Sequence, residues 1–252
     1  HHEHRRQRQM CIRDRLLNMK LFNQKKSTSL MVIIGGCVLL LISFGIRHSS
    51  GLYLIPISNQ LGSGREIFGL AIAIQFLMIG FGSPIFGAVA DKYGSDKAAL
   101  YGVILFLIGL YLFSLVTNSF LLILSQAIFG LGCAGCGTAV ILGAVGKAVS
   151  EKYRTLSLGV VMAAGSLGQF LIVPLSGALI EATDWQRSIV YLCFISLVMI
   201  IFVFALSLRS KNQENEHSQE RPLKQVLGLA FLNKNYVLLL SLIHISEPTR
   251  HS

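Results

Sequence analysis

One stretch of the sequence decides the fold: Gly87-Ala-Val-Ala-Asp-Lys-Tyr-Gly-Ser-Asp-Lys-Ala-Ala-Leu100. It is a short charged segment between two apolar runs, each long enough to cross a lipid bilayer. A glycine closes the first run, Asp91 and Lys92 follow, and Gly94 can reverse the chain. The pattern predicts a tight turn that joins two membrane helices.

The composition agrees with a membrane protein. Hydrophobic residues make up 53% of the chain, charged residues only 13%, and the mean hydropathy is +0.62. A soluble domain carries about 25% charged residues. The 24 glycines suit closely packed membrane helices, because small residues let backbones approach.

Six apolar runs approach or exceed the ~20 residues that span the hydrocarbon core. We expect helices near Leu30–Ile57, Phe68–Ala90, Ala98–Val116, Phe120–Val149, Leu156–Ile180 and Ser188–Leu208. A seventh run begins at about Asn235 and is cut short. Pro84 and Pro174 lie inside two of the runs, where we expect kinks rather than helix ends. The predicted fold is all-α, an integral membrane bundle of six helices plus a truncated seventh.

The two ends of the chain resemble translated sequencing adapters. Arg5–Arg15 resembles the translation of a transposon-type adapter, Leu240–Ser246 resembles the reverse complement of the same oligonucleotide, and Glu247–Arg250 fits the paired adapter. The alternative is a basic amphipathic arm and a His-bearing membrane segment. Under the adapter interpretation the terminal residues are excluded from fold and site arguments. No metal site is then built from the terminal His and Cys residues: His1, His2, His4, Cys11 and His244.

These observations divide the chain into five parts. Residues 1–15 and 240–252 are expected to be adapter-derived, and residues 16–208 to form the six-helix transmembrane domain. Residues 209–230 are polar and lack apolar periodicity, which predicts a cytoplasmic linker. Residues 231–239 would begin the seventh helix, and we expect the natural chain to continue beyond them.

Positive charge is distributed unevenly between the loops. With the amino end inside, twelve Lys and Arg side chains fall in cytoplasmic segments, and only Arg65 and Arg187 fall in outer ones. Loops rich in Lys and Arg stay on the cytoplasmic side. We therefore expect a multi-pass protein of the cell membrane (an inner membrane in bacteria) with a cytoplasmic amino terminus. The net charge of +10 then reflects topology, so no nucleic-acid partner is needed.

Arg47 is the first candidate for substrate binding. It lies well inside the first apolar run, where a charge costs ~2.5–3.5 kcal/mol even on the lenient insertion scale. Its helical neighbours Ser43, Ser50 and Gly51 form a small polar stripe that we expect to face a water-filled path. A guanidinium group donates two parallel hydrogen bonds to a carboxylate. The alternatives are that Arg47 reaches the outer surface or pairs with a carboxylate in the missing part of the protein.

The substrate class follows from the charges inside the spans. None of the predicted spans contains a buried Asp or Glu, so this part of the chain lacks a fixed carboxylate that could carry a proton. This favours a small organic anion, with a co-moving proton as the candidate coupling ion, over a cationic drug. His48 could titrate near neutral pH; the alternative is a neutral side chain hydrogen-bonded to a neighbouring helix.

Three amide side chains lie inside spans: Gln75, Gln126 and Gln169. Each could orient a substrate or link two helices. The remaining cysteines also lie inside spans, and Cys133-Ala-Gly-Cys136 has a spacing found in metal and redox sites. The pair, however, lies in the small-residue run Gly130–Gly137, with no second ligand pair. We therefore predict a helix–helix contact there, with no metal and no cofactor.

The turn described first resembles the signature loop of the major facilitator superfamily, Gly-x-x-x-Asp-Arg/Lys-x-Gly followed by basic residues. Ser95 and Asp96 stand here in place of two of those basic residues. The resemblance implies a secondary active transporter, not an enzyme, built from two six-helix halves that alternately open to either side. This chain would then be the amino-terminal half, and the missing carboxy-terminal half would be its partner.

The resemblance also implies a role for the turn. In the family it locks the two halves at the cytoplasmic face, which makes gating residues of Gly87, Asp91, Lys92, Gly94 and Lys97. The alternative is a charged loop that only sets topology. Many family members have Arg at the position of Gln126, so a charged coupling residue is not expected in the fourth span.

Other motifs are similar to the monocarboxylate and oxalate/formate branch of this family. They are Gly45-Ile-Arg-His-Ser-Ser-Gly51, Arg65-Glu66, Ala163-Ala-Gly-Ser-Leu-Gly168 with Pro174, and Asp184-Trp-Gln-Arg187. This resemblance implies transport of a monocarboxylate. If transport is coupled to an ion, the expected mode is symport with a proton. The alternatives are drug or sugar transport by the same fold, and a six-span membrane scaffold or sensor.

Overall fold

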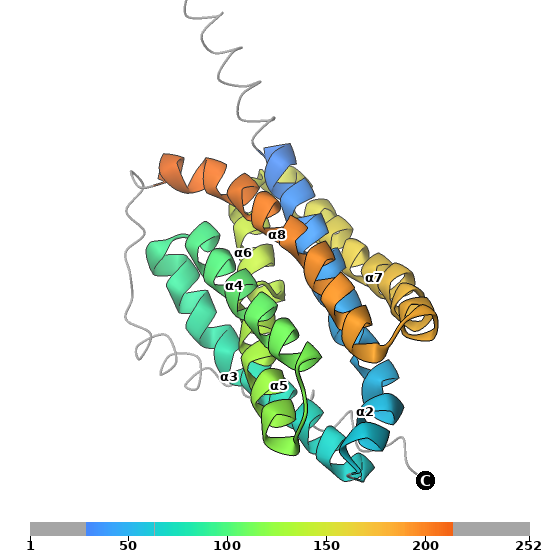
Figure 1. The fold of residues 1–252 in the computed structure, drawn as a ribbon. Helices are drawn as coiled ribbons and strands as arrows, with labels where there is room; N and C mark the ends of the chain where they lie inside the picture. The colour runs from blue at the N-terminus through green and yellow to red at the C-terminus, as the bar shows by residue number, and fades with distance from the viewer. Residues whose placement is uncertain (1–28, 63, 214–252) are drawn as a thin grey trace, which may run out of the picture. The chain divides into compact units, whose positions relative to one another are not determined.

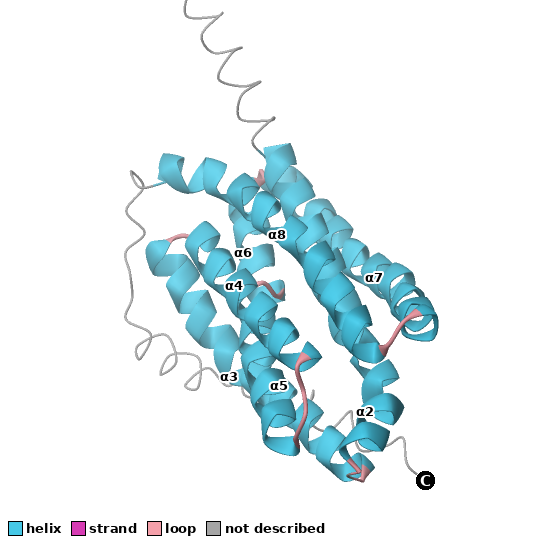
Figure 2. Ribbon diagram, viewed as in Figure 1, coloured by secondary structure: helices cyan, strands magenta, loops and turns pink. Residues whose placement is uncertain are grey.

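The computed structural model describes residues 29–62 and 64–213, and every regular element in this part is helical. The first helix covers residues 29–49 and continues through the 3₁₀ turn η1 (Ser50–Tyr53) into α2 (Leu54–Leu61). The later helices are α3 (Arg65–Tyr93), α4 (Ser95–Ser114), α5 (Ser119–Gly135), α6 (Thr138–Ala148), α7 (Glu151–Ala182) and α8 (Trp185–Gln213). In the described part of the chain, six helical segments are long and apolar enough to cross a membrane, and the predicted all-α membrane fold is confirmed (Figure 2).

The helices follow the expected spans closely. Pro84 and Pro174 lie inside α3 and α7, which run on past them. Two spans differ from the uninterrupted helices predicted. The first passes through the 3₁₀ turn η1, and the fourth is divided into α5 and α6, because Cys136 and Gly137 leave the helical conformation. The adapter-like ends and the seventh run lie outside the described residues, as does most of the predicted linker. Only its first residues are described, and there α8 remains helical as far as Gln213.

The helices pack side by side along a common direction (Figure 1). Helix α4 packs against α5 and α8, and α5 also packs against α3. Helix α7 contacts α6 and α8, and its Gly168 meets the backbone of Leu41 on the first helix. Segments far apart in the sequence therefore enclose one interior.

Glycines create the closest of these contacts. A side chain at Gly132 or Gly109 would collide with the backbone of Phe106 or Phe129 across the α4–α5 contact, and Gly102 faces Gly135 there. Gly130 lies against the backbone of Gln75 on α3. The predicted helix–helix contact in the small-residue run is thereby confirmed: glycine is needed there because two backbones approach each other.

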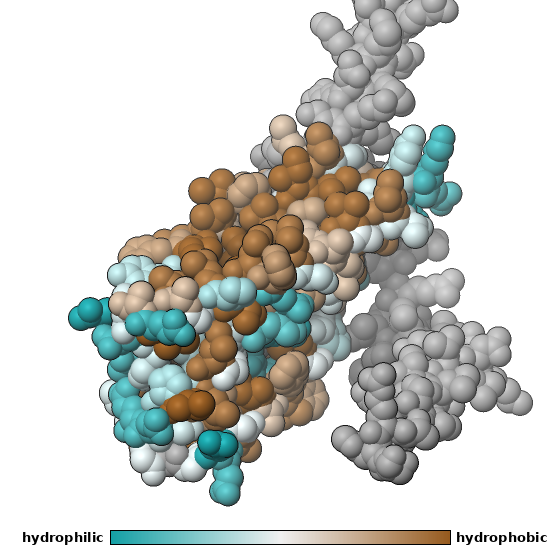
Figure 3. All heavy atoms as spheres, turned by 90° about the vertical axis from the view of Figure 1, so that its right-hand side faces the viewer, coloured by the Kyte–Doolittle hydropathy of each residue, from teal (hydrophilic) through white to brown (hydrophobic). Residues whose placement is uncertain are grey.

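The outer surface is apolar. Large hydrophobic side chains are exposed along α3, α7 and α8, among them Phe81, Phe170 and Phe204. Figure 3 shows a broad apolar area on the face that it draws. Such a surface suits contact with lipid or with other membrane helices.

Candidate functional site

A cavity of about 170 Å³ lies among the first helix, α3 and the junction of α5 with α6. Its volume is close to the ~150 Å³ that holds a benzene molecule in an engineered protein core. Only one lining residue is charged. The lining residues are Ser43, Phe44, Arg47, Ile79, Ser83, Cys133, Gly137 and Thr138. Such a mixture of one cation, hydroxyl groups and apolar walls fits a small ligand with an anionic group and an apolar body.

Arg47 lies near the middle of its span. It is ~27 Å along the helix from Ser29 and ~21 Å from Leu61 at 1.5 Å per residue. Its guanidinium carbon lies 4.9 Å from the ring centroid of Phe44 and 5.7 Å from that of Phe76. Both distances are within the range of cation–π attraction. Cation–π attraction to the two rings therefore helps to hold the guanidinium beside the cavity.

The guanidinium of Arg47 has no carboxylate partner among the described residues. The described Asp and Glu side chains are exposed except for the half-buried Asp96, and the ion pairs found involve Lys147 and Arg187. Nε of Arg47 is buried and makes no hydrogen bond. A buried, unpaired donor on a cation is costly, so an anion entering the cavity would gain a directed and charge-assisted contact.

The hydroxyl groups of the cavity are not equivalent as donors. Ser83 donates its hydroxyl hydrogen to the carbonyl oxygen of Ile79 at 2.7 Å, and Ser43 makes a longer contact of 3.5 Å with the carbonyl of Leu40. A serine that donates to its own helix presents only lone pairs to a ligand. Arg47, whose Nε makes no hydrogen bond, is therefore the main side-chain donor among the lining residues.

Of the side chains expected to bind substrate, the structure places Arg47 in this cavity and the others outside its lining. His48 is exposed, and its Nδ1 lies 2.8 Å from the carbonyl oxygen of Phe44, one turn earlier in the same helix. Gln169 is half-buried on α7. The binding role of these residues stays a prediction.

Gln75 and Gln126 belong to the α3–α5 contact. Both side chains are 1% exposed. Nε2 of Gln75 and Oε1 of Gln126 make no hydrogen bond. Gly130, which touches the backbone of Gln75, is one helical turn after Gln126, so the two amides share one helix interface. A buried amide with an open donor or acceptor favours a second partner, such as water or the other amide after a small movement.

Most of the cavity lining was not predicted from the sequence. Phe44, Ser83 and Thr138 each carry little signal alone, because apolar and hydroxyl side chains are common in membrane helices. The pairs Ser43 with Arg47 and Ile79 with Ser83 are spaced by one helical turn, so each pair shares a helix face. The first spacing was used to predict the polar stripe of Ser43 and Arg47; the second could have indicated another polar helix face, but not which helices face each other.

The turn between α3 and α4 is also more structured than the sequence alone shows. Gly94 has φ of 101°, a conformation that side chains rarely adopt, which explains the glycine. Oδ1 of Asp91 lies 2.7 Å from Nζ of Lys147 at the end of α6. Lys92 lies against the ring of Tyr93, and Lys97 is exposed. The turn is therefore tied to the fourth span, through a lysine that the sequence analysis did not single out.

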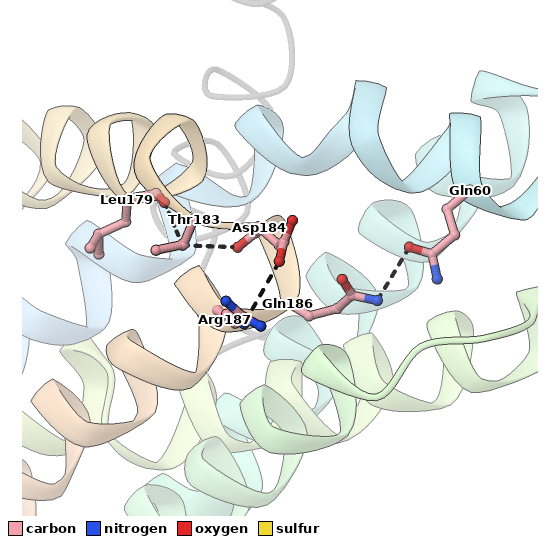
Figure 4. Close-up of polar contacts among 6 residues, drawn as sticks. All are labelled: Gln60, Leu179, Thr183, Asp184, Gln186 and Arg187. Carbon is pink, nitrogen blue, oxygen red and sulfur yellow. Dashed lines mark hydrogen bonds and ion pairs between the residues drawn. The ribbon is translucent and has the colours of Figure 1, made fainter.

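The opposite end of the bundle is joined by polar contacts between α2 and α8. Oε1 of Gln60 accepts hydrogen bonds from Nε1 of Trp185 at 2.8 Å and from Nε2 of Gln186 at 3.3 Å. Arg187 lies 3.7 Å from Asp184, and both side chains are mostly exposed (Figure 4). The Asp184–Arg187 motif thus shapes the entry to α8 and lies outside the cavity lining.

Comparison with known proteins gives a family match over most of the chain. A family model described as Major Facilitator Superfamily matches residues 31–246. The chain is 29% identical over 134 residues to the uncharacterized MFS-type transporter YwfA of Bacillus subtilis, which is 53% of this chain and 32% of the relative. It is 23% identical over 173 residues to monocarboxylate transporter 13 of Bos taurus, 68% of this chain and 40% of the relative.

A third relative transports a different substrate. The sialic acid transporter NanX of Escherichia coli is 26% identical over 138 residues, 52% of this chain and 31% of the relative. The chain therefore spans less than half the length of these curated relatives.

Solved structures agree on the fold. A mutant of the peptide transporter POT in complex with alafosfalin superposes with a TM-score of 0.63 and 16% identity, over 87% of this chain and 50% of that one. POT in complex with sulfate gives a TM-score of 0.60 and 18% identity, over 89% and 47% of the two chains. At this identity the likeness concerns the helical architecture alone.

Proposed function

Because this chain belongs to the Major Facilitator Superfamily, we propose that it forms part of a secondary transporter that moves a small organic anion, such as a monocarboxylate, across the membrane. The observation that carries the proposal is the cavity around Arg47. Its only charged lining residue is a guanidinium that has a buried, unbonded Nε and no carboxylate partner among the described residues. The likeness to monocarboxylate transporter 13 supports the same substrate class.

The proposed mechanism involves two parts of the protein, the cavity and the α3–α4 turn. In the cavity, Arg47 binds the carboxylate while Phe44 and Ile79 contact the apolar body of the substrate. At the turn, Asp91 and its neighbours hold the closed arrangement of the helices, and loss of these contacts accompanies opening. The second six-helix half of a complete transporter would close the site from the other side.

A proton is the proposed coupling ion, and the turn is proposed to face the cytoplasm. The distribution of Lys and Arg supports this orientation. A single cysteine introduced at Lys97, which is exposed, should be labelled by an impermeant maleimide only in inside-out vesicles. Labelling in right-side-out vesicles would contradict the orientation. A transmembrane pH gradient should drive accumulation of the anion if protons are coupled.

The substrate class is tested with the gene product that carries this chain. In proteoliposomes, uptake of radiolabelled L-lactate and benzoate is compared with uptake of lactamide and benzamide, which have the same shape without the charge. The Arg47→Ala variant should reduce carboxylate uptake by about 10- to 100-fold, the effect of losing ~1.5–3 kcal/mol of charged hydrogen bonding. Arg65→Ala is the matched control, because Arg65 is exposed at the start of α3.

The outcomes separate the candidate functions. Loss of carboxylate uptake in Arg47→Ala with normal uptake in Arg65→Ala supports the proposal. Equal uptake of acids and amides would favour a transporter of neutral or cationic compounds. Absence of uptake for every compound would favour a membrane scaffold or sensor.

A further inference from the structure

The fourth span is interrupted within the membrane. Helix α5 ends at Gly135 and α6 begins at Thr138, although the whole segment from Ser119 to Ala148 is apolar enough to cross a bilayer. The interruption at Gly137 lies ~27 Å along the segment from Ser119 and ~17 Å from Ala148. Both distances place it well inside the span.

An interruption at this depth leaves polar backbone groups without partners. The first four N–H groups of a helix have no partner within it, and no side chain caps the start of α6. In a membrane, open backbone is tolerated only where it is buried in protein or lines a wet cavity. Here the open backbone lines a cavity, because Gly137 and Thr138 line the same cavity as Arg47.

The end of α5 contributes the opposite kind of group. The carbonyl oxygen of Cys133 lies next to Gly137, where a side chain would collide with it. Carbonyl oxygens repel an anion, so the break alone does not select the sign of a ligand. The guanidinium of Arg47, with its buried and unbonded Nε, selects an anion.

We propose that the start of α6 is the second half of the carboxylate site. One carboxylate oxygen binds the guanidinium of Arg47, and the other accepts hydrogen bonds from the backbone N–H groups of Gly137 and Thr138. This inference rests on the function proposed above and adds to it a substrate-binding backbone segment that the sequence analysis did not identify. Half-helix starts at the membrane midplane serve anionic substrates in other transporter folds.

The site has consequences for specificity. A carboxylate offers two acceptor oxygens, which matches donors from two different helices that line the cavity. A primary amide replaces one of those oxygens with a donor group, so it loses one of the two contacts. The apolar side chains of Phe44 and Ile79 then contact the remainder of the molecule. The ligand class is a small carboxylate with a compact apolar body.

The backbone role is tested with the variant Thr138→Pro. Proline removes the N–H of this residue, and it is well accepted at the first position of a helix. Gly137, with φ of −90° and ψ of −170°, is extended, as the residue before a proline prefers to be. Thr138→Val is the matched control, because it removes the hydroxyl and retains the N–H.

A third variant supplies a carboxylate from the protein itself, in place of the substrate carboxylate. Thr138→Asp places a carboxylate in the first turn of α6, where a negative charge is favourable, and beside the same cavity as Arg47. Thr138→Asn is its neutral control. The aspartate variant should fold with a melting temperature equal to or above that of the wild type, and should bind no added carboxylate.

The measurement is calorimetric titration of the purified gene product with benzoate and, separately, benzamide. Thr138→Pro should weaken benzoate binding at least 10-fold and Thr138→Val less than 3-fold. Suppose that wild type binds benzoate and Arg47→Ala does not. If Thr138→Pro and Thr138→Asp then bind benzoate as well as wild type does, this inference is overturned and the proposed function stands. Equal losses in Thr138→Pro and Thr138→Val would also overturn it. If wild type binds neither benzoate nor L-lactate, the proposed function itself fails.

Discussion

Nζ of Lys147 in the last turn of α6 lies 2.7 Å from Oδ1 of Asp91 near the end of α3. The two side chains are 48% and 76% exposed. An exposed ion pair contributes only ~0.2–1 kcal/mol to stability. Its position is therefore more informative than its strength: it ties the charged turn to the last turn of α6, the helix whose first residue, Thr138, lines the cavity.

The first prediction concerns this pair. Asp91→Asn should lower the transport rate several-fold while changing the melting temperature by only a few degrees, because the pair is weak in stability but is proposed to hold one state of the gate. Asp184→Asn is the matched control, since Asp184 also forms an exposed ion pair, at 3.7 Å from Arg187, outside the turn. Uptake rate and thermal unfolding are measured for both.

The charge-reversed double variant Asp91→Lys with Lys147→Asp distinguishes pairing from topology. If the pair matters, the double variant should recover more transport than either single variant. A turn that only sets topology would give normal uptake in Asp91→Asn, and that result would remove Asp91 from the gate.

The second prediction concerns the aromatic neighbours of Arg47. Phe76→Leu should raise the KM for a carboxylate by about 2- to 5-fold, the effect of losing ~0.5–1 kcal/mol of cation–π attraction. The maximal transport rate should change less, because Phe76 acts on substrate binding by positioning the guanidinium. Phe81→Leu is the control, since Phe81 is exposed on the same helix and 64% accessible. Equal KM values in the two variants would mean that Phe76 does not position Arg47.

The third prediction concerns the glycines of the α4–α5 contact. Gly132→Ala should destabilise the protein by about 1–3 kcal/mol, because the new methyl group would meet the backbone of Phe106. Gly143→Ala should be neutral or slightly stabilising, because the added methyl group would meet nothing within 4 Å outside its own helix backbone and alanine favours a helix. Thermal unfolding in detergent is measured for both. A Gly132→Ala protein as stable as wild type would contradict the contact.

The limits of the membrane helices could be predicted because hydropathy is a local property of the sequence. Pro84 and Pro174 could be placed inside helices for the same reason: in a membrane a helix continues past a proline when its neighbours supply partners. The interruption at Gly137 could not be predicted in this way. Glycine only lowers the preference for helix by ~1 kcal/mol, and the outcome depends on packing.

The composition of the site was harder to predict than the fold. The unusual charge of Arg47 identified it from the sequence, because a cation in a span needs a reason. Thr138 and Lys147 have no such signal. Their neighbours are set by the way the helices pack: Asp91 and Lys147 are 56 positions apart. Sequence spacing within one helix gives no information on such contacts.

The fourth prediction concerns a buried hydrogen bond between the first span and α8. The hydroxyl oxygens of Tyr53 and Ser188 lie 2.9 Å apart, and the two residues are 1% and 0% exposed. Tyr53→Phe leaves the Ser188 hydroxyl without this partner in a dry interior, which should lower the free energy of unfolding by about 1–3 kcal/mol. Ser188→Ala should cost less, because the tyrosine hydroxyl loses this partner but keeps its contact with Ser176. The double variant Tyr53→Phe with Ser188→Ala should be less destabilised than the sum of the two, since both polar groups are then absent. Additive losses in this cycle, measured by thermal unfolding in detergent, would show that the two hydroxyls do not stabilise the bundle through each other.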